Sequence, residues 1–309
     1  MKTKKRIKIV VIYGPTGIGK TSTGINLARD LSGEIINADS MQIYKEMTIG
    51  TAKPDEAELA AIPHHLVDIV SPDESFDAAL FAEAAGKKIE ALSKRNILPI
   101  IVGGTAFYIK ALLYGLFREN PANQETLEKI GLEYNEKGPN EMHNKLKSVD
   151  PVSAGKIHKN DSFRIIRALE VFQSTGKPIS SFQKDHDFQD EKFDSLKICL
   201  TMDREKLYDR INRRVDIMID SGLLEEVKGL IAKGYTKDLK SMRSIGYKHM
   251  TEFIEGVNDW EETVRLLKRD TRRYAKRQFT WLRKEKDVNW AEPSDYNRIK
   301  KITEEFLKS

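Results

Sequence analysis

Cysteine is almost absent from this chain of 309 residues, which contains only Cys199. A single cysteine inside an apolar run excludes a disulfide framework and a zinc site built on cysteines. No apolar run approaches the roughly 20 residues that a membrane-spanning helix requires. The sequence also has no internal repeat and no low-complexity segment. With 39% hydrophobic and 32% charged residues, we expect a soluble globular protein.

A large excess of one charge is also missing, because 52 Lys and Arg residues stand against 47 Asp and Glu residues. The net charge of +5 therefore says little by itself about nucleic acid. The basic residues 1–6 precede an apolar run and then a glycine-rich loop rather than a cleavage site, so we do not expect a signal peptide. We expect a cytoplasmic protein whose length suffices for one large domain or two.

The glycine-rich loop of residues 14–21 is the most informative stretch of the chain. It fits the pattern G-x-x-x-x-G-K-[ST] and lies between a predicted strand, Ile7–Tyr13, and a predicted helix, Ser22–Leu31. Backbone amides of such a loop and of the helix N-terminus point at a bound anion. Lys20 adds a positive charge, and the Thr21 hydroxyl can ligate Mg²⁺. The predicted polyphosphate-binding residues are Gly14, Pro15, Thr16, Gly17, Ile18, Gly19, Lys20 and Thr21.

Strands and helices alternate in the segment that follows. The predicted strands are 34–38, 63–70 and 97–102, and the predicted helices are 55–61, 76–94 and 106–114. This alternation predicts an α/β fold, a P-loop core with a mostly parallel sheet flanked by helices. Asp39 follows the second strand, so we expect its carboxylate in the ligand crevice at the carboxyl ends of the strands.

The composition changes near Arg118, where the strand pattern stops. Residues 118–195 predict an inserted helical domain, with a helix at 162–174 and a polar loop at 180–194. The buried-strand pattern returns at 196–202, which we expect to be the last strand of the sheet. The core then comprises residues 1–117 and 196–309, and the helices predicted in its second part are 203–219, 223–233 and 260–284.

The helix predicted at 260–284 separates its residues onto two faces. Its apolar face carries Val264, Leu267, Tyr274 and Trp281. Its basic face carries Arg265, Arg269, Arg272, Lys276 and Arg277. Such a basic stripe is either a solvated surface or a footprint for a nucleic-acid backbone. A second arginine-rich helix at 203–219 makes the second interpretation equally plausible.

Three classes of phosphate-handling protein fit these residues. They are a kinase of small molecules or nucleotides, an NTPase or nucleotide-driven switch, and a transferase whose substrate leaves a diphosphate. No guanine-recognising N-K-x-D pattern is present, which argues against a GTP switch. An inserted helical domain and a basic C-terminal helix exceed what a small kinase needs, and they suggest a large anionic substrate.

A series of motifs, in order over nearly the whole chain, resembles the tRNA dimethylallyltransferase (tRNA isopentenyltransferase) family. The matching segments are GPTGIGKT at 14–21, DSMQIY at 39–44, GTAKP at 50–54, PHHLVDI at 63–69, GGTAFYIKAL at 103–112, RIIRALEV at 164–171, SMRSIGY at 241–247 and RRYAKRQFTWLR at 272–283. One small departure is Ala106-Phe107, where the family often has Gly-Leu. The sequence lacks the cysteine pair of the zinc finger that eukaryotic members often add, so it resembles the bacterial type.

The resemblance implies a reaction. Members transfer the dimethylallyl group of dimethylallyl diphosphate to the exocyclic N6 amine of the adenine 3′-adjacent to the anticodon of tRNA. The phosphate loop and Mg²⁺ would stabilise the diphosphate, and Asp39, ionised at neutral pH like an ordinary aspartate, would accept the amine proton. The residues implied to be catalytic are Asp39, Thr21, Lys20 and Arg243.

The resemblance also implies how the tRNA anticodon stem-loop is held. The target base would flip out of its stack to reach the reaction centre. The residues implied to bind tRNA are Asp39, Ser40, Met41, Gln42, Thr105, Phe163, Arg164, Ile165, Ile166 and Arg167. Thr105 is alternatively a helix cap, and His64 matches a family histidine for which a structural role is equally supported. We expect a monomer without membrane partners. The alternatives are a prenyltransferase acting on free adenine nucleotides and a P-loop kinase.

Overall fold

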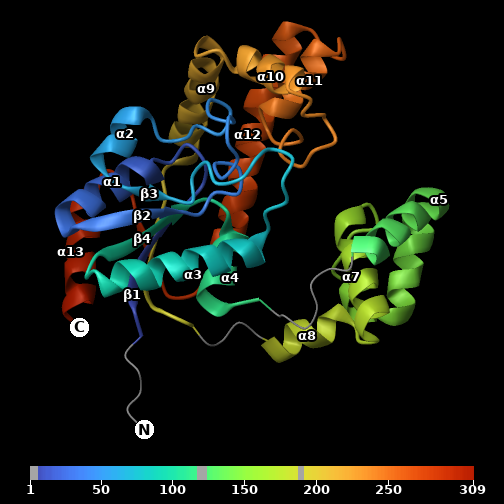
Figure 1. The fold of residues 1–309 in the computed structure, drawn as a ribbon, viewed down its shortest axis with the longest axis horizontal. Coiled ribbons are helices and arrows are strands. Elements are labelled where there is room, and N and C mark those ends of the chain that lie inside the picture. Colours follow the sequence, from blue (N-terminus) through green and yellow to red (C-terminus); the bar gives the residue numbers. More distant parts are fainter. Residues whose placement is uncertain (1–5, 117–123, 187–190) are drawn as a thin grey trace. The chain divides into compact units, whose positions relative to one another are not determined.

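The chain folds into two compact units, which are described separately in this computed structural model (Figure 1). The structure describes residues 6–116, 124–186 and 191–309. One unit comprises Met1–Leu113 with Glu191–Ser309, and the other comprises Tyr114–Asp190. The sequence analysis placed the second boundary after residue 195. It falls earlier because Glu191 accepts hydrogen bonds from Ser195 and Lys197 of the following strand, at 2.7 Å each.

A six-stranded sheet forms the centre of the larger unit, as the α/β prediction required. Its strands are β1 (Lys8–Tyr13), β2 (Gly33–Asn37), β3 (His64–His65), β4 (Leu98–Gly103), β5 (Asp194–Leu200) and β6 (Val288–Ala291). The order is β3-β2-β4-β1-β5-β6, and every neighbouring pair is parallel. The four residues Ile9–Ile12 are completely buried, as expected for a strand that helices cover on both faces.

Two strand predictions were wrong in detail. The strand expected at 63–70 forms a regular strand only at His64–His65, because Leu66 and Asp68 adopt positive φ angles that leave the extended conformation, and Val70 pairs separately with Tyr44 in an isolated bridge. The strand at 196–202 is not the last of the sheet, because β6 pairs with β5 beyond it. A strand of four residues, VNWA, carries too little pattern to be found from sequence.

Helices of the larger unit follow the strands. They are α1 (Lys20–Leu31), α2 (Glu56–Ala61), α3 (Ala78–Lys94), α4 (Ala106–Tyr114), α9 (Arg204–Asp220), α10 (Leu223–Ala232), α11 (Tyr247–Ile254), α12 (Trp260–Leu282) and α13 (Tyr296–Lys308). Residues of α1, α9, α12 and α13 join those of β1, β4 and β5 in one buried hydrophobic cluster. Helix α12 thus reaches the sheet core, and it begins where the Asp259 side chain accepts from the amide of Glu262.

The smaller unit is helical. Its helices are α5 (Gln124–Val149), α6 (Pro151–Ala154), α7 (Ser162–Thr175) and α8 (Ile179–His186). Helix α5 breaks at Gly138, whose φ of 78° is left-handed and which precedes Pro139. The polar loop expected at 180–194 was wrong, because α8 forms there. The side chain of buried Asp150 accepts the amide of Ser180 in α8 at 3.0 Å. The side chain of Phe182, in the same helix, is also buried.

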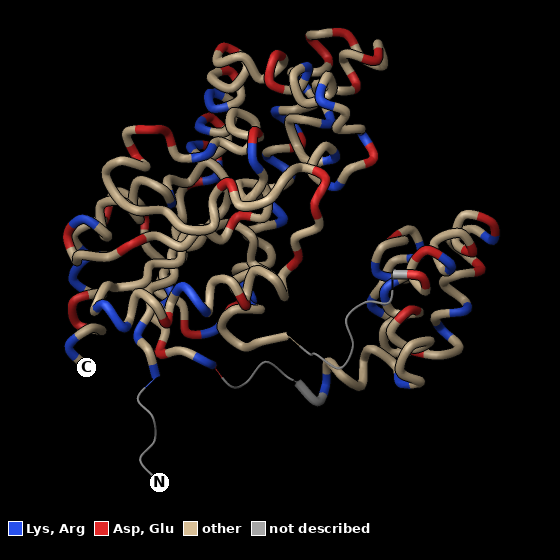
Figure 2. The backbone as a smooth tube through the Cα atoms, viewed as in Figure 1, with Lys and Arg blue, Asp and Glu red and all other residues tan. Residues whose placement is uncertain are grey.

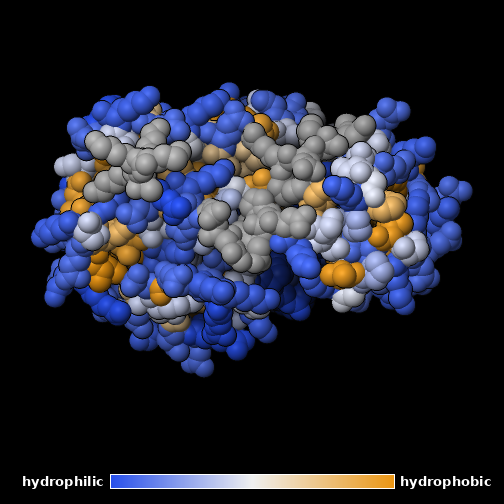
Figure 3. Space-filling model, turned by 90° about the horizontal axis from the view of Figure 1, so that it is seen from below, coloured by the Kyte–Doolittle hydropathy of each residue, from blue (hydrophilic) through white to orange (hydrophobic). Residues whose placement is uncertain are grey.

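The surface of the chain is polar and mixed in charge. Acidic and basic residues are both scattered over both units, between stretches of other residues (Figure 2). The face drawn in Figure 3 is mostly hydrophilic, with small separated hydrophobic patches. Within the described residues, no helix has both the length and the apolar character of a bilayer-spanning segment.

Candidate active site

The phosphate loop forms a cradle of backbone amides between β1 and α1. Gly17 and Gly19 adopt left-handed φ angles of 78° and 107°, which glycine accepts without strain. In the described part of the chain, the amides of these two glycines have no hydrogen-bond acceptor. The first amides of α1 lack acceptors within the helix, as at any helix N-terminus. The loop therefore has several amide donors that are available to an anion.

Lys20 supplies the positive charge of the cradle. Its Nζ donates to the carbonyl of Pro15 at 2.9 Å, which folds the side chain back over the loop. Burial lowers the pKa of Lys20 to about 8, although the charge of Asp39 acts in the opposite direction. Thr21 follows on the first turn of α1 and is half-buried.

Asp39 lies beyond the carboxyl end of β2, facing the phosphate loop. Its Oδ1 accepts the amide of Met41 at 2.9 Å. Its charge acts on Lys20 from α1, Arg214 from α9 and Tyr274 from α12. The Asp39 carboxylate thus lies near two cationic side chains, those of Lys20 and Arg214. Helices α9 and α12 contribute residues to its surroundings in addition to α1.

Thr105 holds the segment that follows Asp39. Its Oγ1 accepts the amide of Ser40 at 3.0 Å and donates to the Ser40 hydroxyl at 3.2 Å. The side chain is engaged with Ser40, while the Thr105 carbonyl accepts the amides of Tyr108 and Ile109 at the start of α4, at 2.9 and 3.3 Å. The structure is therefore consistent with both roles, at the site and at the helix start. The preceding Gly103 is required sterically, since a Cβ there would lie 2.1 Å from the carbonyl oxygen of Ala38.

Gln42 faces the loop of residues 48–53. Its Nε2 donates to the carbonyls of Thr51 and Ala52 at 3.1 and 3.0 Å. That loop is fixed in turn by Glu226, whose carboxylate accepts the amides of three consecutive residues and the hydroxyl of Tyr247. The segment containing Ser40, Met41 and Gln42 is therefore anchored at both ends.

Arg214 and Gln278 are site residues to which the sequence analysis assigned no role. Burial lowers the pKa of Arg214, and the charge of Asp39 opposes this shift. Gln278 contacts the phosphate loop directly, since its Oε1 accepts the amide of Thr16 at 2.9 Å. One feature of the sequence could have pointed to Arg214. Its helix, α9, follows β5, the strand next to β1, and therefore starts near the carboxyl ends of the strands.

The tRNA-binding residues predicted in α7 separate into two groups. Phe163 is 80% exposed, and Arg164 is exposed beside Asp161. Arg167 is half-buried and forms an ion pair with Glu170. Ile165 is completely buried in the core of the helical unit, and Ile166 packs against that core. The Ile165 side chain therefore stabilises the unit and is not available to RNA, so the prediction for this residue is left with its backbone alone.

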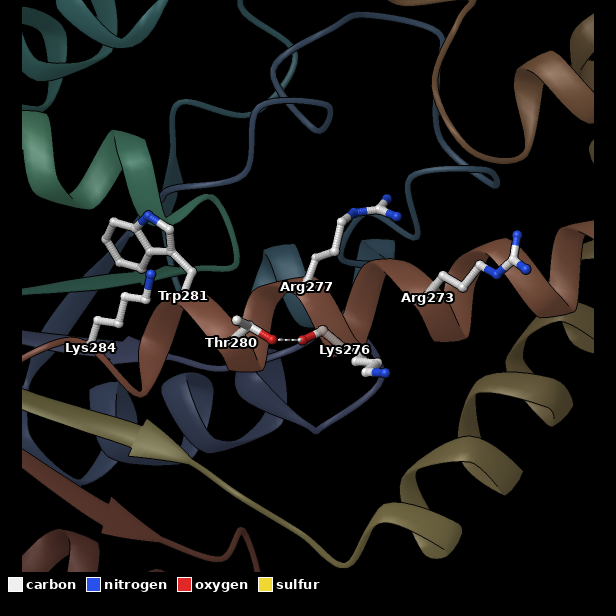
Figure 4. Close-up of a pocket in the computed structure, with 6 residues that line it drawn as sticks. All are labelled: Arg273, Lys276, Arg277, Thr280, Trp281 and Lys284. Atoms are coloured by element: carbon white, nitrogen blue, oxygen red, sulfur yellow. Dashed lines mark hydrogen bonds between the residues drawn. The ribbon is translucent and has the colours of Figure 1, made fainter. Parts of the chain in front are cut away.

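Arg243 lies in a cation-rich cavity rather than in the phosphate loop. Its guanidinium is exposed and lies 3.3 Å from Asp238. The residues lining this cavity, of about 300 Å³, are Arg243, Ile245, Lys248, His249, Arg269, Asp270, Arg273 and Arg277. Arg273 and Arg277 also line a second cavity of about 440 Å³, together with Lys276, Thr280, Trp281 and Lys284. In Figure 4, Arg273, Arg277 and Trp281 project from the same side of α12.

His64 is a packed residue of β3. Its Nδ1 lies 2.8 Å from the carbonyl oxygen of Ile62, and burial lowers the pKa of the imidazole. The neighbouring His65 pairs with Glu34 at 2.6 Å. These contacts are consistent with the structural role that the sequence analysis left open.

Magnesium fits this site only as an ion shared with a substrate. Across the described residues, no group of three or more His, Cys, Asp or Glu side chains is placed to hold a metal. Thr21 and Asp39 offer one hydroxyl and one carboxylate beside the cradle. Such a sparse donor set suits Mg²⁺, which commonly takes one or two protein ligands and completes its shell with phosphate oxygens and water.

A phosphate loop facing one carboxylate at the edge of a parallel sheet defines a P-loop enzyme that acts on a polyphosphate substrate. The family model described as "IPP transferase" matches residues 42–285. The chain belongs to this family, and it is therefore a transferase.

Relatives of known name match nearly the full length of the chain. The tRNA dimethylallyltransferase of Desulfosudis oleivorans is 47% identical over 304 residues, covering 98% of this chain and 97% of the relative. That of Alkaliphilus oremlandii is 48% identical over 306 residues, covering 99% and 97%.

Solved structures are similar as well. The tRNA isopentenylpyrophosphate transferase of Bacillus halodurans has a TM-score of 0.72 and 39% identity, covering 97% of each chain. A eukaryotic dimethylallyltransferase acting on tRNA has a TM-score of 0.76 and 33% identity, covering 89% of this chain and 70% of that one.

Proposed function

We propose that the protein transfers the dimethylallyl group of dimethylallyl diphosphate to the N6 amine of the adenine 3′-adjacent to the anticodon in tRNA. The products are N6-isopentenyladenine and diphosphate. The observation that carries this proposal is that the Asp39 carboxylate lies close to the phosphate loop. Its negative charge acts on the side chains of Lys20 and Arg214. A base and an anion cradle at one point are what a transfer with a diphosphate leaving group requires.

The reaction breaks the bond between the allylic carbon and the bridging oxygen and forms a bond from that carbon to N6. The leaving electron pair goes to the diphosphate, where the amides of Gly17 and Gly19 and the Lys20 ammonium stabilise the added charge. The adenine amine is a poor nucleophile because its lone pair is delocalised into the ring. Asp39 accepts the N6 proton, which makes attack easier. Thr21 would be the protein ligand of a Mg²⁺ ion, which would supply positive charge at the leaving group.

The tRNA is held at several places in this proposal. Ser40, Met41 and Gln42 line the pocket of the flipped adenine, with Thr105 fixing Ser40. The unit Tyr114–Asp190 serves as a recognition domain that presents Phe163, Arg164 and Arg167 to the anticodon stem-loop. The cavities of α12 and Arg243 bind its phosphates. We also propose that the protein acts as a monomer in the cytoplasm, where it would meet its tRNA substrate.

The decisive test offers labelled dimethylallyl diphosphate together with unmodified tRNA and, in parallel, free AMP. Label in the tRNA alone supports the proposal. Label in AMP favours the alternative that free adenine nucleotides are the acceptors. Label in neither, with ATP or GTP hydrolysed without a prenyl donor, favours the kinase or switch alternative.

The pH dependence of donor capture should report Lys20. Its pKa of about 8 means that the ammonium is charged below this pH and neutral above it. We therefore expect kcat/KM for dimethylallyl diphosphate to be highest below about pH 8 and to fall up to tenfold per pH unit above it. A series from neutral to alkaline pH measures this break. The Lys20→Arg variant should lack it, and a break unchanged in that variant would assign it to another group.

The cavities of α12 should contribute to tRNA binding through phosphate contacts. The tRNA association constant should fall with salt concentration on a log–log plot. The double variant Arg273→Ala and Arg277→Ala should make the magnitude of this slope smaller by about two. Diphosphate affinity should stay unchanged. A salt titration of tRNA binding provides the measurement, with Arg298→Ala on the exposed face of α13 as the control. An unchanged slope would mean that these cavities do not contact RNA.

A further inference from the structure

Gln278 joins two loops of the site through its side-chain amide. Its Oε1 accepts the amide of Thr16 in the phosphate loop at 2.9 Å. Its Nε2 donates to the carbonyl of Gly104 at 2.8 Å. Gln278 is only 8% exposed, and both of its hydrogen bonds are partly buried.

The first bond determines which amides the phosphate loop can offer. Because the Thr16 amide is bonded to Gln278, it is withdrawn from the cradle. The amides of Gly17 and Gly19 remain without acceptors in the described part of the chain. Gln278 thus fixes the phosphate loop at Thr16 and leaves the amides of Gly17 and Gly19 available to an anion.

The second bond fixes the segment that precedes Thr105, which holds Ser40 beside Asp39. The two loops meet closely here. A Cβ added at Gly104 would lie 2.6 Å from Gln278 Nε2 and 3.5 Å from Lys20 Nζ. Gln278 therefore sits where the phosphate side of the site approaches the side that would receive the base.

From this geometry we infer that Gln278 is a positioning residue that sets the spacing between the diphosphate and the acceptor base. The inference rests on the proposed function for the identity of the two substrates. One amide side chain clamps Thr16 and Gly104 together, so the leaving group and the nucleophile are held by loops of fixed separation. A displacement of about 1 Å in such a constellation can cost a factor of about 100 in rate.

The clamp also connects the site to α12. Gln278 follows Arg277, which lines both cation-rich cavities. Tyr274, one turn earlier, lies in the field of Asp39. One helix therefore presents Gln278 to the two loops and its arginines to the cavities. The clamp acts on the loops alone, so its loss should leave the cavities' affinity for tRNA intact.

Two variants test the clamp at different levels. Gln278→Met has a similar length but no hydrogen-bonding group, and Gln278→Asn keeps both groups but is too short to span them. The matched control on the same helix is Thr271→Val, since the Thr271 hydroxyl donates only to the carbonyl of Leu267. The measurements are inorganic diphosphate binding without tRNA, tRNA binding, single-turnover transfer at saturation and the unfolding temperature.

We expect Gln278→Met to weaken diphosphate binding about tenfold, which is the effect of losing a hydrogen bond or two. The saturated transfer rate should fall roughly tenfold to hundredfold, while tRNA affinity stays within about twofold of the control's. Gln278→Asn should also weaken diphosphate binding and slow transfer, but by smaller factors. This variant keeps the test valid if Gln278→Met does not fold.

Diphosphate binding and transfer rates equal to those of Thr271→Val, with only a lower unfolding temperature, would overturn the inference in favour of a purely structural amide. Loss of tRNA affinity alone would also overturn it. If the wild type transfers no label to tRNA but still binds diphosphate about tenfold more tightly than Gln278→Met, the proposed reaction fails and the positioning of the phosphate loop stands.

Discussion

The Asp39→Asn variant should bind both substrates but transfer the dimethylallyl group about 10²- to 10⁴-fold more slowly, which is the usual contribution of a positioned general base. Asparagine has the same shape, and its Oδ1 can still accept the amide of Met41 that the carboxylate accepts at 2.9 Å. The amide cannot take up a proton from N6. Single-turnover transfer with saturating tRNA and donor measures the loss without interference from product release.

Removing this carboxylate also changes its neighbour. The charge of Asp39 raises the pKa of Lys20, so its loss should lower that pKa further. The comparison is therefore made below neutral pH, away from the range in which Lys20 loses its proton in the wild type. Asp209→Asn, exposed on α9, is the control for a change in charge alone. Full activity of Asp39→Asn would remove Asp39 as the base and leave it a role in positioning Met41.

The parts of the site that sequence predicts well are those fixed by local contacts. The phosphate loop is defined by glycines whose φ angles only glycine adopts easily, and by the strand and helix on either side. The position of Asp39 follows from a strand ending immediately before it. Both depend on residues close together in the chain, and this is why a pattern of a few letters suffices to locate them.

The remaining parts depend on contacts between distant segments. Gln278 lies 262 positions from Thr16, and in the sequence it is one polar residue in a basic helix. Arg214 looked like one of four arginines on α9, and only the packing of α9 beside the phosphate loop brings its charge near Asp39. No local pattern distinguishes a buried arginine that faces a carboxylate from a solvated one.

The same reasoning explains the errors in the elements. The strand β6 exists because β5 offers it a free edge, and the pairing supplies what four residues of weak pattern do not. Helix α8 is held in place because buried Asp150 accepts the amide of Ser180 and the Phe182 side chain is buried. Ile165 was predicted to bind tRNA from its place in a motif, whereas helical periodicity turns it inward and turns Phe163 and Arg164 outward.

The second large effect is expected at Lys20. The Lys20→Met variant should lose about 10²- to 10³-fold in transfer rate, the usual loss when one stabilising donor is removed from a developing charge. Methionine fills a similar volume but removes the Lys20 ammonium, whose Nζ lies 2.9 Å from the carbonyl oxygen of Pro15. Diphosphate binding should weaken as well, because the same charge attracts the substrate and the product. Calorimetric titration with inorganic diphosphate and single-turnover transfer measure the two effects.

The relative size of these two losses distinguishes ground-state from transition-state stabilisation. If Lys20 attracts the diphosphate equally before and during bond breaking, Lys20→Met raises the KM of the donor and leaves kcat nearly unchanged. We expect kcat to fall as well, because the leaving diphosphate gains charge in the transition state. The control is Lys94→Met, exposed at the end of α3. If Lys20→Met keeps the wild-type kcat, Lys20 acts in substrate binding alone. The charge that develops in the transition state would then be stabilised by Arg214 and the amides of the phosphate loop.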